Sequence, residues 1–305
     1  MPPPTTGTLT VPGATLRYEK RGSGPVLLLI PGGAADAGVY EGMAPDLALR
    51  YTVVSYDPRG LSRSSLEEPL SDQRVEVWSD DAHRLLSALA PDGEACVLGS
   101  SSGAVVALDL LARHPGQVRR VVAHEPPLVE LLDDPAPHRA LFAEVRETFR
   151  LHGTGPAMTR FSEGLGGRPA EPATELPPGI QEMAARMHAN LPVFLEHILC
   201  PFTATTPDVP ALRAAAHKLV LAVGRDSRTQ EPLYGPATRL AALLGRPAVE
   251  FPGGHVGCTE YPREFAAQLL RVLDQDRELS SGSSSEPEDE ARAVSPAGQR
   301  GRPPS

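Results

Sequence analysis

Val97-Leu98-Gly99-Ser100-Ser101-Ser102-Gly103-Ala104 is the stretch on which the interpretation of this chain depends. An apolar run with the character of a buried strand ends at Gly99, and a helical pattern begins just after Ser102. Ser101 is the only one of the three serines with a glycine two residues away on both sides, which gives the pattern G-x-S-x-G. In a nucleophile elbow the serine occupies a sharp, strained turn from strand to helix, and a side chain at either glycine would crowd that turn. Ser101 is therefore the candidate nucleophile.

Apolar runs and helix-like patterns alternate along most of the rest of the chain. The run Pro25–Ile30 is apolar throughout, which is typical of a strand buried on both faces of a sheet. This alternation predicts a mostly parallel central sheet with helices on both faces, an α/β fold. The expected strands lie at about 8–11, 14–18, 25–30, 51–56, 96–98, 118–124, 218–223 and 248–251, and the expected helices end near 50 or span about 75–89, 103–114, 235–244 and 261–275.

Residues 128–212 interrupt this alternation, because no buried-strand pattern occurs among them. Helix-like stretches at about 137–151, 155–164, 179–190 and 192–199, separated by turns rich in Pro and Gly, predict a helical cap inserted over the sheet. From 278 onward the chain has no apolar face to bury, which predicts disorder. The expected organisation is a frayed N-terminus at 1–6, core at 7–127, cap at 128–212, core at 213–277 and a disordered tail at 278–305.

Composition excludes several classes of partner. The formal net charge of −9 over 305 residues argues against nucleic acid, which requires a basic face. No apolar run approaches the roughly 20 residues that span a bilayer, so a membrane partner is not expected. Three widely spaced cysteines form no disulfide framework and indicate a reducing compartment such as the cytoplasm. His197 and Cys200 have a loose metal-like spacing but no second pair, so no metal site is predicted.

Three polar residues follow separate expected strands in the order Ser101, Asp226, His255. This is the order Ser…Asp…His of α/β-fold hydrolases, and ligands of open α/β sheets gather beyond the carboxyl ends of the strands. Glu125 is the alternative acid, because it directly follows the run that ends at residue 124. We favour Asp226, because Gly224 gives its chain freedom to turn and its strand should neighbour the one that leads to His255. The two prolines after Glu125 indicate a hinge or pocket wall instead.

Several motifs together resemble one family. They are Ile30-Pro31-Gly32-Gly33, Tyr56-Asp57-Pro58-Arg59-Gly60, Gly99-Ser100-Ser101-Ser102-Gly103, His124-Glu125-Pro126-Pro127, Gly224-Arg225-Asp226 and Gly253-Gly254-His255. Over roughly 14–275 the sequence resembles the α/β-hydrolase superfamily, in its branch of small capped serine esterases, haloperoxidase-like and proline-iminopeptidase-like enzymes.

The resemblance implies a serine hydrolase that cleaves a carboxylic ester, lactone or related acyl bond without a cofactor. His255 would take the proton of Ser101 and Asp226 would orient the imidazole. The backbone amides of Ser102 and Gly33 would form the oxyanion hole. Three alternatives stay open: cofactor-free perhydrolysis, proline-iminopeptidase activity, and a non-catalytic small-molecule-binding protein on the same fold.

Two positions depart from the pattern of the family. Pro31 stands where many relatives carry histidine, which alters the anchoring of this loop. Ser62 replaces the second glycine of D-x-R-G-x-G-x-S, which affects the shape of that loop more than the chemistry.

The expected cap is rich in residues that form apolar pockets. It holds five of the seven phenylalanines and three of the five methionines. Most of them must form the core of the cap, but Met is common on adaptable binding surfaces and apolar walls are typical of ligand pockets. We therefore expect some of them, first Met187 and Phe194, to face Ser101. The expected substrate is a small molecule with an apolar acyl or alcohol group.

Overall fold

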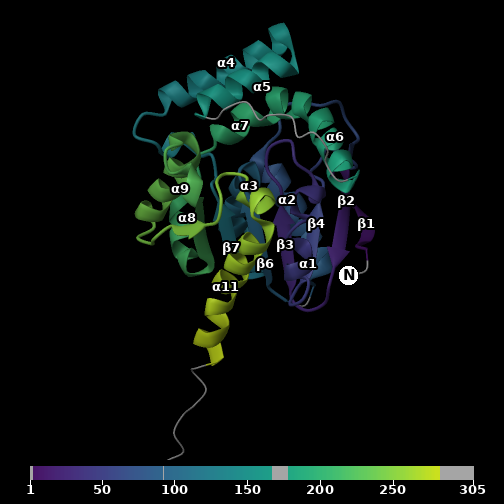
Figure 1. Ribbon diagram of the computed structural model, residues 1–305. Helices are drawn as coiled ribbons and strands as arrows, with labels where there is room; N and C mark the ends of the chain where they lie inside the picture. The colour runs from purple at the N-terminus through teal and green to yellow at the C-terminus, as the bar shows by residue number, and fades with distance from the viewer. Residues whose placement is uncertain (1–2, 92, 167–177, 282–305) are drawn as a thin grey trace, which may run out of the picture.

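The computed structural model describes residues 3–91, 93–166 and 178–281. Within them a nine-stranded sheet has the order β1-β2-β4-β3-β6-β7-β8-β9, with the short β5 paired to β2 (Figure 1). The pairs from β4 through β9 are parallel, whereas β1, β2 and β4 pair antiparallel and form one edge. The strands are β1 Thr5–Val11, β2 Ala14–Arg21, β3 Val26–Ile30, β4 Thr52–Tyr56, β5 Ser65–Leu66, β6 Ala95–Ser100, β7 Val118–His124, β8 Leu219–Gly224 and β9 Val249–Phe251.

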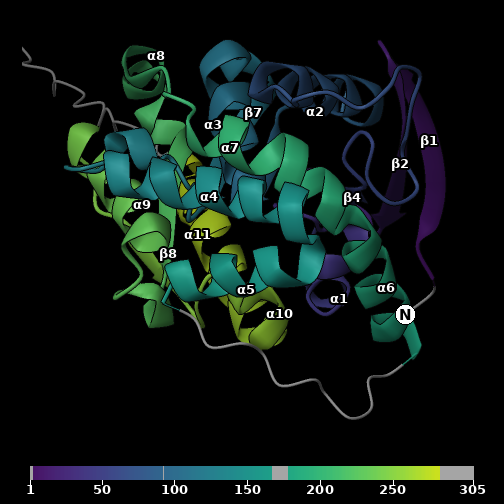
Figure 2. The same ribbon diagram turned by 90° about the horizontal axis from the view of Figure 1, so that it is seen from above.

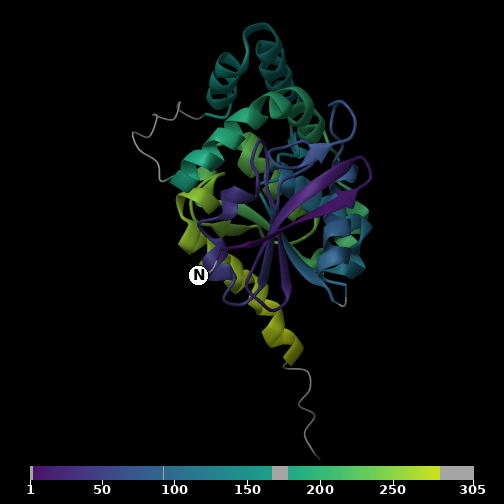
Figure 3. The same ribbon diagram turned by 90° about the vertical axis from the view of Figure 1, so that its right-hand side faces the viewer.

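Side chains of each central strand alternate between two apolar cores, one on each face of the sheet. In β3, Leu28 and Ile30 contribute to the core that α2 and α3 cover, and Leu27 and Leu29 contribute to the core that α1 and α11 cover. Figure 3 shows these helix pairs on opposite sides of the strands. The mostly parallel sheet covered on both faces is thereby confirmed. The helices are α1 Ala44–Leu47, α2 Val75–Leu89, α3 Ser102–Arg113, α4 Ala136–His152, α5 Thr154–Gly164, α6 Pro178–Val193, α7 Leu199–Thr203, α8 Val209–Ala214, α9 Glu231–Leu243, α10 Gly257–Glu260 and α11 Pro262–Ser281.

Helices α4 to α7 lie together across the end of the sheet where the parallel strands finish (Figures 1 and 2). Phe142 of α4, Phe161 of α5 and Phe202 of α7 are among the residues that face Ser101 there. Helix α8, by contrast, lies beside α3, and Leu212 of α8 lines a small surface pocket together with Val105 and Leu108 of α3. The helical insertion therefore covers the end of the sheet at which Ser101 lies.

Most of the expected elements are present, and four differences bear on the organisation of the chain. The first strand begins at Thr5, so residues 5 and 6 pair within the sheet, and the expected helix before residue 50 is only the short α1 and a 3-10 turn. Helix α11 continues to Ser281, so the expected disorder is wrong at 278–281, and the rest of that tail lies outside the described residues.

The fourth difference is in the cap, where no break separates 179–190 from 192–199. Helix α6 passes through Pro192 and continues as a π-helical turn over Phe194–Ile198. Proline cannot donate to the carbonyl four residues earlier and its ring crowds that carbonyl. The π-helical turn follows directly after this interrupted stretch, and such turns are frequent at functional sites. The turn carries Phe194 and Ile198 into the pocket described below.

Candidate active site

Ser101 lies at the junction of β6 and α3 with a backbone that side chains rarely adopt. Its φ is 54° and its ψ is −125°, and its N–H donates to the carbonyl of His124 at 2.9 Å. The close approach of neighbouring backbone explains two nearby glycines. A Cβ on Gly103 would overlap the carbonyl oxygen of Ile30, and one on Gly32 would overlap the carbonyl of Ser100. The G-x-S-x-G stretch thus has the strained geometry of a nucleophile elbow.

His255 follows β9 in the loop that leads to α10, and its ring contacts Ser101. The distance from His255 Nε2 to Ser101 Oγ is 3.0 Å, which is a hydrogen-bond distance. The side chain of His255 is 22% exposed, so one part of the ring faces the pocket and the other faces protein. A histidine in this position can accept the proton of the serine hydroxyl.

Glu125 is the acid that contacts the second nitrogen of this ring. Its Oε2 lies 2.7 Å from His255 Nδ1 and also accepts from Ser227 Oγ at 3.3 Å, and its Oε1 accepts from the Gly224 amide at 2.7 Å. The side chain is fully buried. Burial alone would raise the pKa of Glu125, but the hydrogen bonds from His255 and Gly224 and the attraction of the His255 imidazole together hold the pKa below its usual value. The carboxylate therefore stays ionised next to His255.

The expectation that Asp226 orients His255 is wrong in this structure. The Asp226 side chain is 51% exposed and binds the guanidinium of Arg225, with Nε to Oδ1 at 3.0 Å. Gly224, expected to turn the chain back sharply, is extended at φ −75° and ψ 134°. A glycine is needed there for another reason, because a Cβ would meet the backbone of Gly254. Strand β8 does neighbour β9 as expected, but the turn after it directs the carboxylate outward.

Glu125 reaches the histidine because of its backbone and its length. Its φ of +47° places it in the left-handed region, directly after β7 and beside the end of β6 that carries Ser101. Its N–H remains in the sheet, donating to the carbonyl of Ala222 at 2.9 Å. The two prolines after Glu125 do not prevent its contact with His255. Pro127 lines the pocket, as expected of a wall residue.

The sequence analysis did not predict a role for two residues that support Glu125. Ser227 donates to Glu125 from the 3-10 turn after β8, and in the sequence it looks like any turn serine. His124 is buried next to Glu125 with its ring edge-on to Phe251 and Phe265, and burial lowers the pKa of His124 to about 4. His124 is thus neutral at ordinary pH, so it does not compete with His255 for the negative charge of Glu125. Only its place beside Glu125 in the sequence could have drawn attention to it.

The two expected amide donors lie next to each other, and one of them already has a partner. Gly33 N–H donates to the side-chain oxygen of Ser102 at 2.7 Å. Gly33 has a φ of +60°, which suits glycine, and a Cβ there would lie 3.8 Å from the ring of Phe194. Ser102 is the first residue of α3, where backbone amides have no acceptor within the helix and favour negative charge.

A largely apolar pocket opens above Ser101 and His255. Rings dominate its wall, and Phe161 stands between Phe142 and Phe194 with centroid separations of 6.3 and 5.8 Å. Phe194 faces Ser101 as expected, but Met187 is not among the lining residues, because its part of α6 lies over the loop after β3. The lining residues are Ser101, Ser102, Pro127, Phe142, Phe161, Leu165, Phe194, Ile198, Leu199, Phe202, Thr203, Leu233 and His255.

Comparison with known proteins identifies the family. Residues 25–163 match the family model described as the alpha/beta hydrolase fold. Over 276 residues the chain is 38% identical to the uncharacterized hydrolase YraK of Bacillus subtilis, covering 89% of this chain and 97% of that protein. The chain belongs to the α/β-hydrolase superfamily. Its relatives in this superfamily include hydrolases.

Two further similarities concern other members of this superfamily. The α/β hydrolase described here is 27% identical to the zearalenone hydrolase of Bionectria ochroleuca, over 89% of this chain and 98% of that one. Among solved structures, a thermophilic esterase from Thermogutta terrifontis superposes with a TM-score of 0.68 at 19% identity, covering 89% of this chain and 98% of that chain. At this identity the second similarity supports the shared fold alone.

Among the residues that the structure describes, no three His, Cys, Asp or Glu side chains gather closely enough to hold a metal ion. Within the same ranges, no helix is both long and apolar enough to cross a bilayer.

Proposed function

We propose that this α/β hydrolase cleaves a carboxylic ester or lactone through Ser101, His255 and Glu125. The observation that carries the proposal is the continuous hydrogen-bonded path from Ser101 Oγ through both ring nitrogens of His255 to Glu125. A serine hydroxyl is a weak nucleophile near neutral pH, and an adjacent base with an oriented ring removes this limitation.

The proposed reaction has two halves. In the first, Ser101 Oγ attacks the carbonyl carbon while its proton moves to His255 Nε2, and the buried Glu125 carboxylate stabilises the imidazolium without taking the proton. His255 then gives that proton to the leaving alcohol, and an acyl group remains on Ser101. In the second half His255 activates a water molecule, which releases the acid and restores Ser101.

The backbone amides of Ser102 and Gly33 are the proposed donors to the tetrahedral oxyanion. Such donors act in a water-poor site and each contributes about 10²–10³-fold to kcat. Ser102 Oγ, which now accepts from Gly33, must turn away for both amides to reach a substrate oxygen.

The lining of the pocket supports a substrate with an apolar group at the reacting end. Its wall contains four phenylalanine rings, and the hydroxyl of its Thr203 is engaged with the carbonyl of Leu199 at 2.8 Å. A charged acyl group would lose its hydration there without gaining a partner. Hydrolysis of an organic molecule is consistent with the relative named zearalenone hydrolase.

A fluorophosphonate probe and a series of p-nitrophenyl esters test the proposal. We expect covalent labelling of Ser101 in the wild type, turnover that favours apolar acyl chains, and loss of both in Ser101→Ala by about 10⁴-fold or more in kcat. Ser100→Ala is the matched control and should still be labelled, because Ser100 does not contact His255. Absence of labelling and turnover in the folded wild type would indicate a binding protein on this fold instead.

A further inference from the structure

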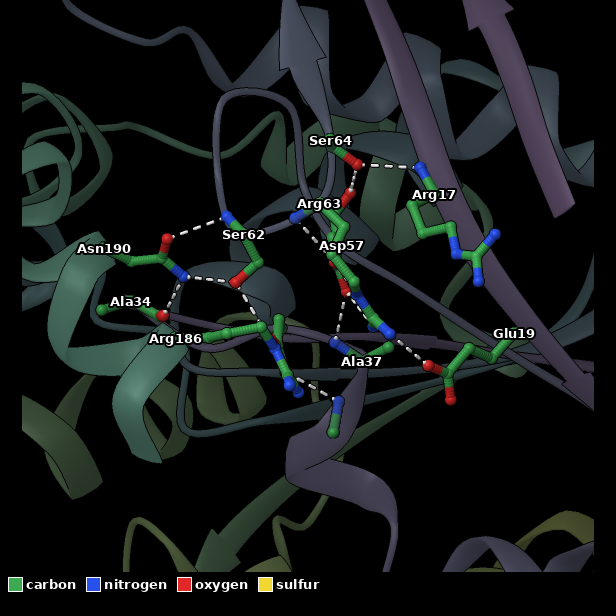
Figure 4. Close-up of polar contacts among 12 residues, drawn as sticks. Arg17, Glu19, Ala34, Ala37, Asp57, Ser62, Arg63, Ser64, Arg186 and Asn190 are labelled. Atoms are coloured by element: carbon green, nitrogen blue, oxygen red, sulfur yellow. Dashed lines mark hydrogen bonds and ion pairs between the residues drawn. The ribbon is translucent and has the colours of Figure 1, made fainter. Parts of the chain in front are cut away.

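A buried polar cluster joins cap helix α6 to the loop that carries Gly33. We call residues 31–36, which follow β3, the β3 loop. The cluster consists of Arg186 and Asn190 from α6, Ser62 from the loop after β4, and Ala34 and Asp36 from the β3 loop (Figure 4). Arg186 and Asn190 are four residues apart and therefore share one face of the helix.

Asn190 uses all of its side-chain amide in this cluster. Its Nδ2 donates to the Ala34 carbonyl at 2.9 Å and to Ser62 Oγ at 2.8 Å, and its Oδ1 accepts from the Ser62 amide at 2.8 Å. The residue is only 4% exposed. Of the polar side chains of similar size, only an amide supplies two donors and an acceptor in this arrangement, so a carboxylate would face the Ala34 carbonyl with an acceptor.

Ser62 links Asn190 to Asp36 through its hydroxyl. Its hydroxyl donates to Asp36 Oδ2 at 2.9 Å, and the same carboxylate binds Arg186 Nε at 2.5 Å and the Gly38 amide at 2.8 Å. Burial alone would raise the pKa of Asp36, but these three partners together lower the pKa below its usual value. The β3 loop is thus tied to the cap at both Ala34 and Asp36.

The backbone of Ser62 is strained, with a φ of 51°. Ser62 replaces the second glycine of the motif D-x-R-G-x-G-x-S, and a glycine would adopt such a backbone without strain. Residues held in this conformation cost about 1–3 kcal/mol, and the surrounding contacts must maintain them. The serine hydroxyl makes two hydrogen bonds that a glycine could not make. These contacts explain why a serine stands at this strained position.

The cluster acts on the loop next to a proposed oxyanion donor. Gly33 precedes Ala34, whose carbonyl Asn190 holds, and a Cβ on Gly33 would contact the pocket ring of Phe194. The residue after the β3 loop is also held by the core, since Ala37 N–H donates to Asp57 Oδ1 at 3.1 Å. The placement of the Gly33 amide therefore depends on the seating of α6.

We propose that Asn190, assisted by Arg186 through Ser62 and Asp36, is a positioning residue for the oxyanion hole, so that the hole is complete only when α6 is seated on the β3 loop. This inference rests on the proposed function. Asn190 contacts no reacting atom. It fixes the Ala34 carbonyl and thereby restricts the backbone of the loop that carries the Gly33 N–H.

Asn190→Asp tests the proposal in the full-length protein, with p-nitrophenyl butyrate as substrate and 2-phenylethaneboronic acid as a ligand. The boronic acid accepts the Ser101 oxygen and becomes tetrahedral, so its affinity reports on the oxyanion hole without turnover. We expect kcat to fall by about 10–10²-fold and boronic acid affinity to fall with it, while KM changes less than threefold, because a misplaced oxyanion donor affects the transition state more than the ground state.

Ser62→Ala is the second variant, in case the carboxylate prevents folding. It removes the hydroxyl that links Asn190 to Asp36 and keeps the backbone, so kcat should fall in the same sense by a smaller factor. Ser62→Gly loses the same hydroxyl but relieves the strain, and it should match Ser62→Ala in kcat while having a higher Tm.

Asp72→Asn is the matched control for a loosened cap. Asp72 joins the cap to the core elsewhere, through His197 Nδ1 at 3.2 Å and Arg146 at 3.6 Å, and should leave kcat within twofold. Equal losses in Asp72→Asn and Asn190→Asp, a change in KM alone, or unchanged kcat in both Asn190→Asp and Ser62→Ala would overturn the proposal. A wild type that is neither labelled by a fluorophosphonate nor active on esters would instead refute the proposed function itself, and this inference with it.

Discussion

Two carboxylates follow neighbouring strands of the same sheet, and their surroundings differ completely. Glu125 after β7 is fully buried and receives hydrogen bonds from His255, Gly224 and Ser227. Asp226 after β8 is half exposed and pairs with the adjacent Arg225. The comparison teaches that position at the carboxyl end of a strand is not enough to define a site. Only the carboxylate whose backbone turns it inward acquires the partners that keep it charged and directed.

Removal of the charge at Glu125 should give the largest effect. In Glu125→Gln we expect kcat on p-nitrophenyl butyrate to fall by about 10³–10⁴-fold, because an amide can stabilise the wrong imidazole tautomer. Asp226→Asn is the matched control and should keep kcat within twofold, since its side chain faces solvent. A large loss in Asp226→Asn with a mild one in Glu125→Gln would reverse the assignment made from the structure.

Shortening the same side chain should give an intermediate effect. Glu125→Asp keeps the charge but withdraws the carboxylate by one methylene from His255 Nδ1, now at 2.7 Å. A displacement of about 1 Å in a catalytic group can cost on the order of 10²-fold, so kcat should lie between those of the wild type and Glu125→Gln. Steady-state kinetics of the three proteins would check this order, and a Glu125→Asp variant as active as the wild type would contradict the importance of the contact.

The pH dependence of stability should also separate the two carboxylates. Because the pKa of Glu125 is lowered in the folded protein, its ionised form contributes stability that is fully present above its unfolded pKa of about 4.3 and is lost as the pH falls through the lower folded value. The difference in the free energy of unfolding between the wild type and Glu125→Gln should therefore shrink from pH 6 to pH 3 in urea titrations. A difference that stays constant over this range would contradict the lowered pKa.

Changes at the exposed pair should have the smallest effect. Asp226→Ala breaks the contact with Arg225 in a solvent-exposed place, where such pairs contribute little. We expect the free energy of unfolding to change by less than about 0.5 kcal/mol in urea at pH 7. A loss above about 2 kcal/mol would mean that Asp226 has buried partners after all.

The fold and part of the site could be predicted from local sequence. The elbow at Ser101, the histidine after the last strand and the cap phenylalanines depend on patterns within a few residues, and the structure brings Ser101, His255 and Phe194 together. The choice of acid could not be made in this way. It depends on the left-handed backbone of Glu125 and on partners about 100 residues away, such as Gly224.

Long-range contacts explain the other failure. Met187 and Phe194 have similar apolar character in the sequence, but Asn190 and Arg186 fix α6 over the β3 loop through residues 128 and 150 positions away. Met187 therefore belongs to the stretch of helix over that loop, and only the π-helical turn beyond Pro192 delivers Phe194 and Ile198 to the pocket. Neither a polar contact between distant segments nor a π-helical turn has a signature in the apolar pattern.

The hydrogen bond from Gly33 N–H to Ser102 Oγ is an internal competitor for the proposed oxyanion hole. A neutral ester carbonyl that enters exchanges one uncharged acceptor for another at this amide and gains little affinity. A developing oxyanion forms a charge-assisted bond, roughly twice as strong, and displaces the hydroxyl with a net gain. In the proposed mechanism this contact therefore makes the amide bind the transition state more strongly than the bound substrate. Such differential binding raises kcat without lowering KM.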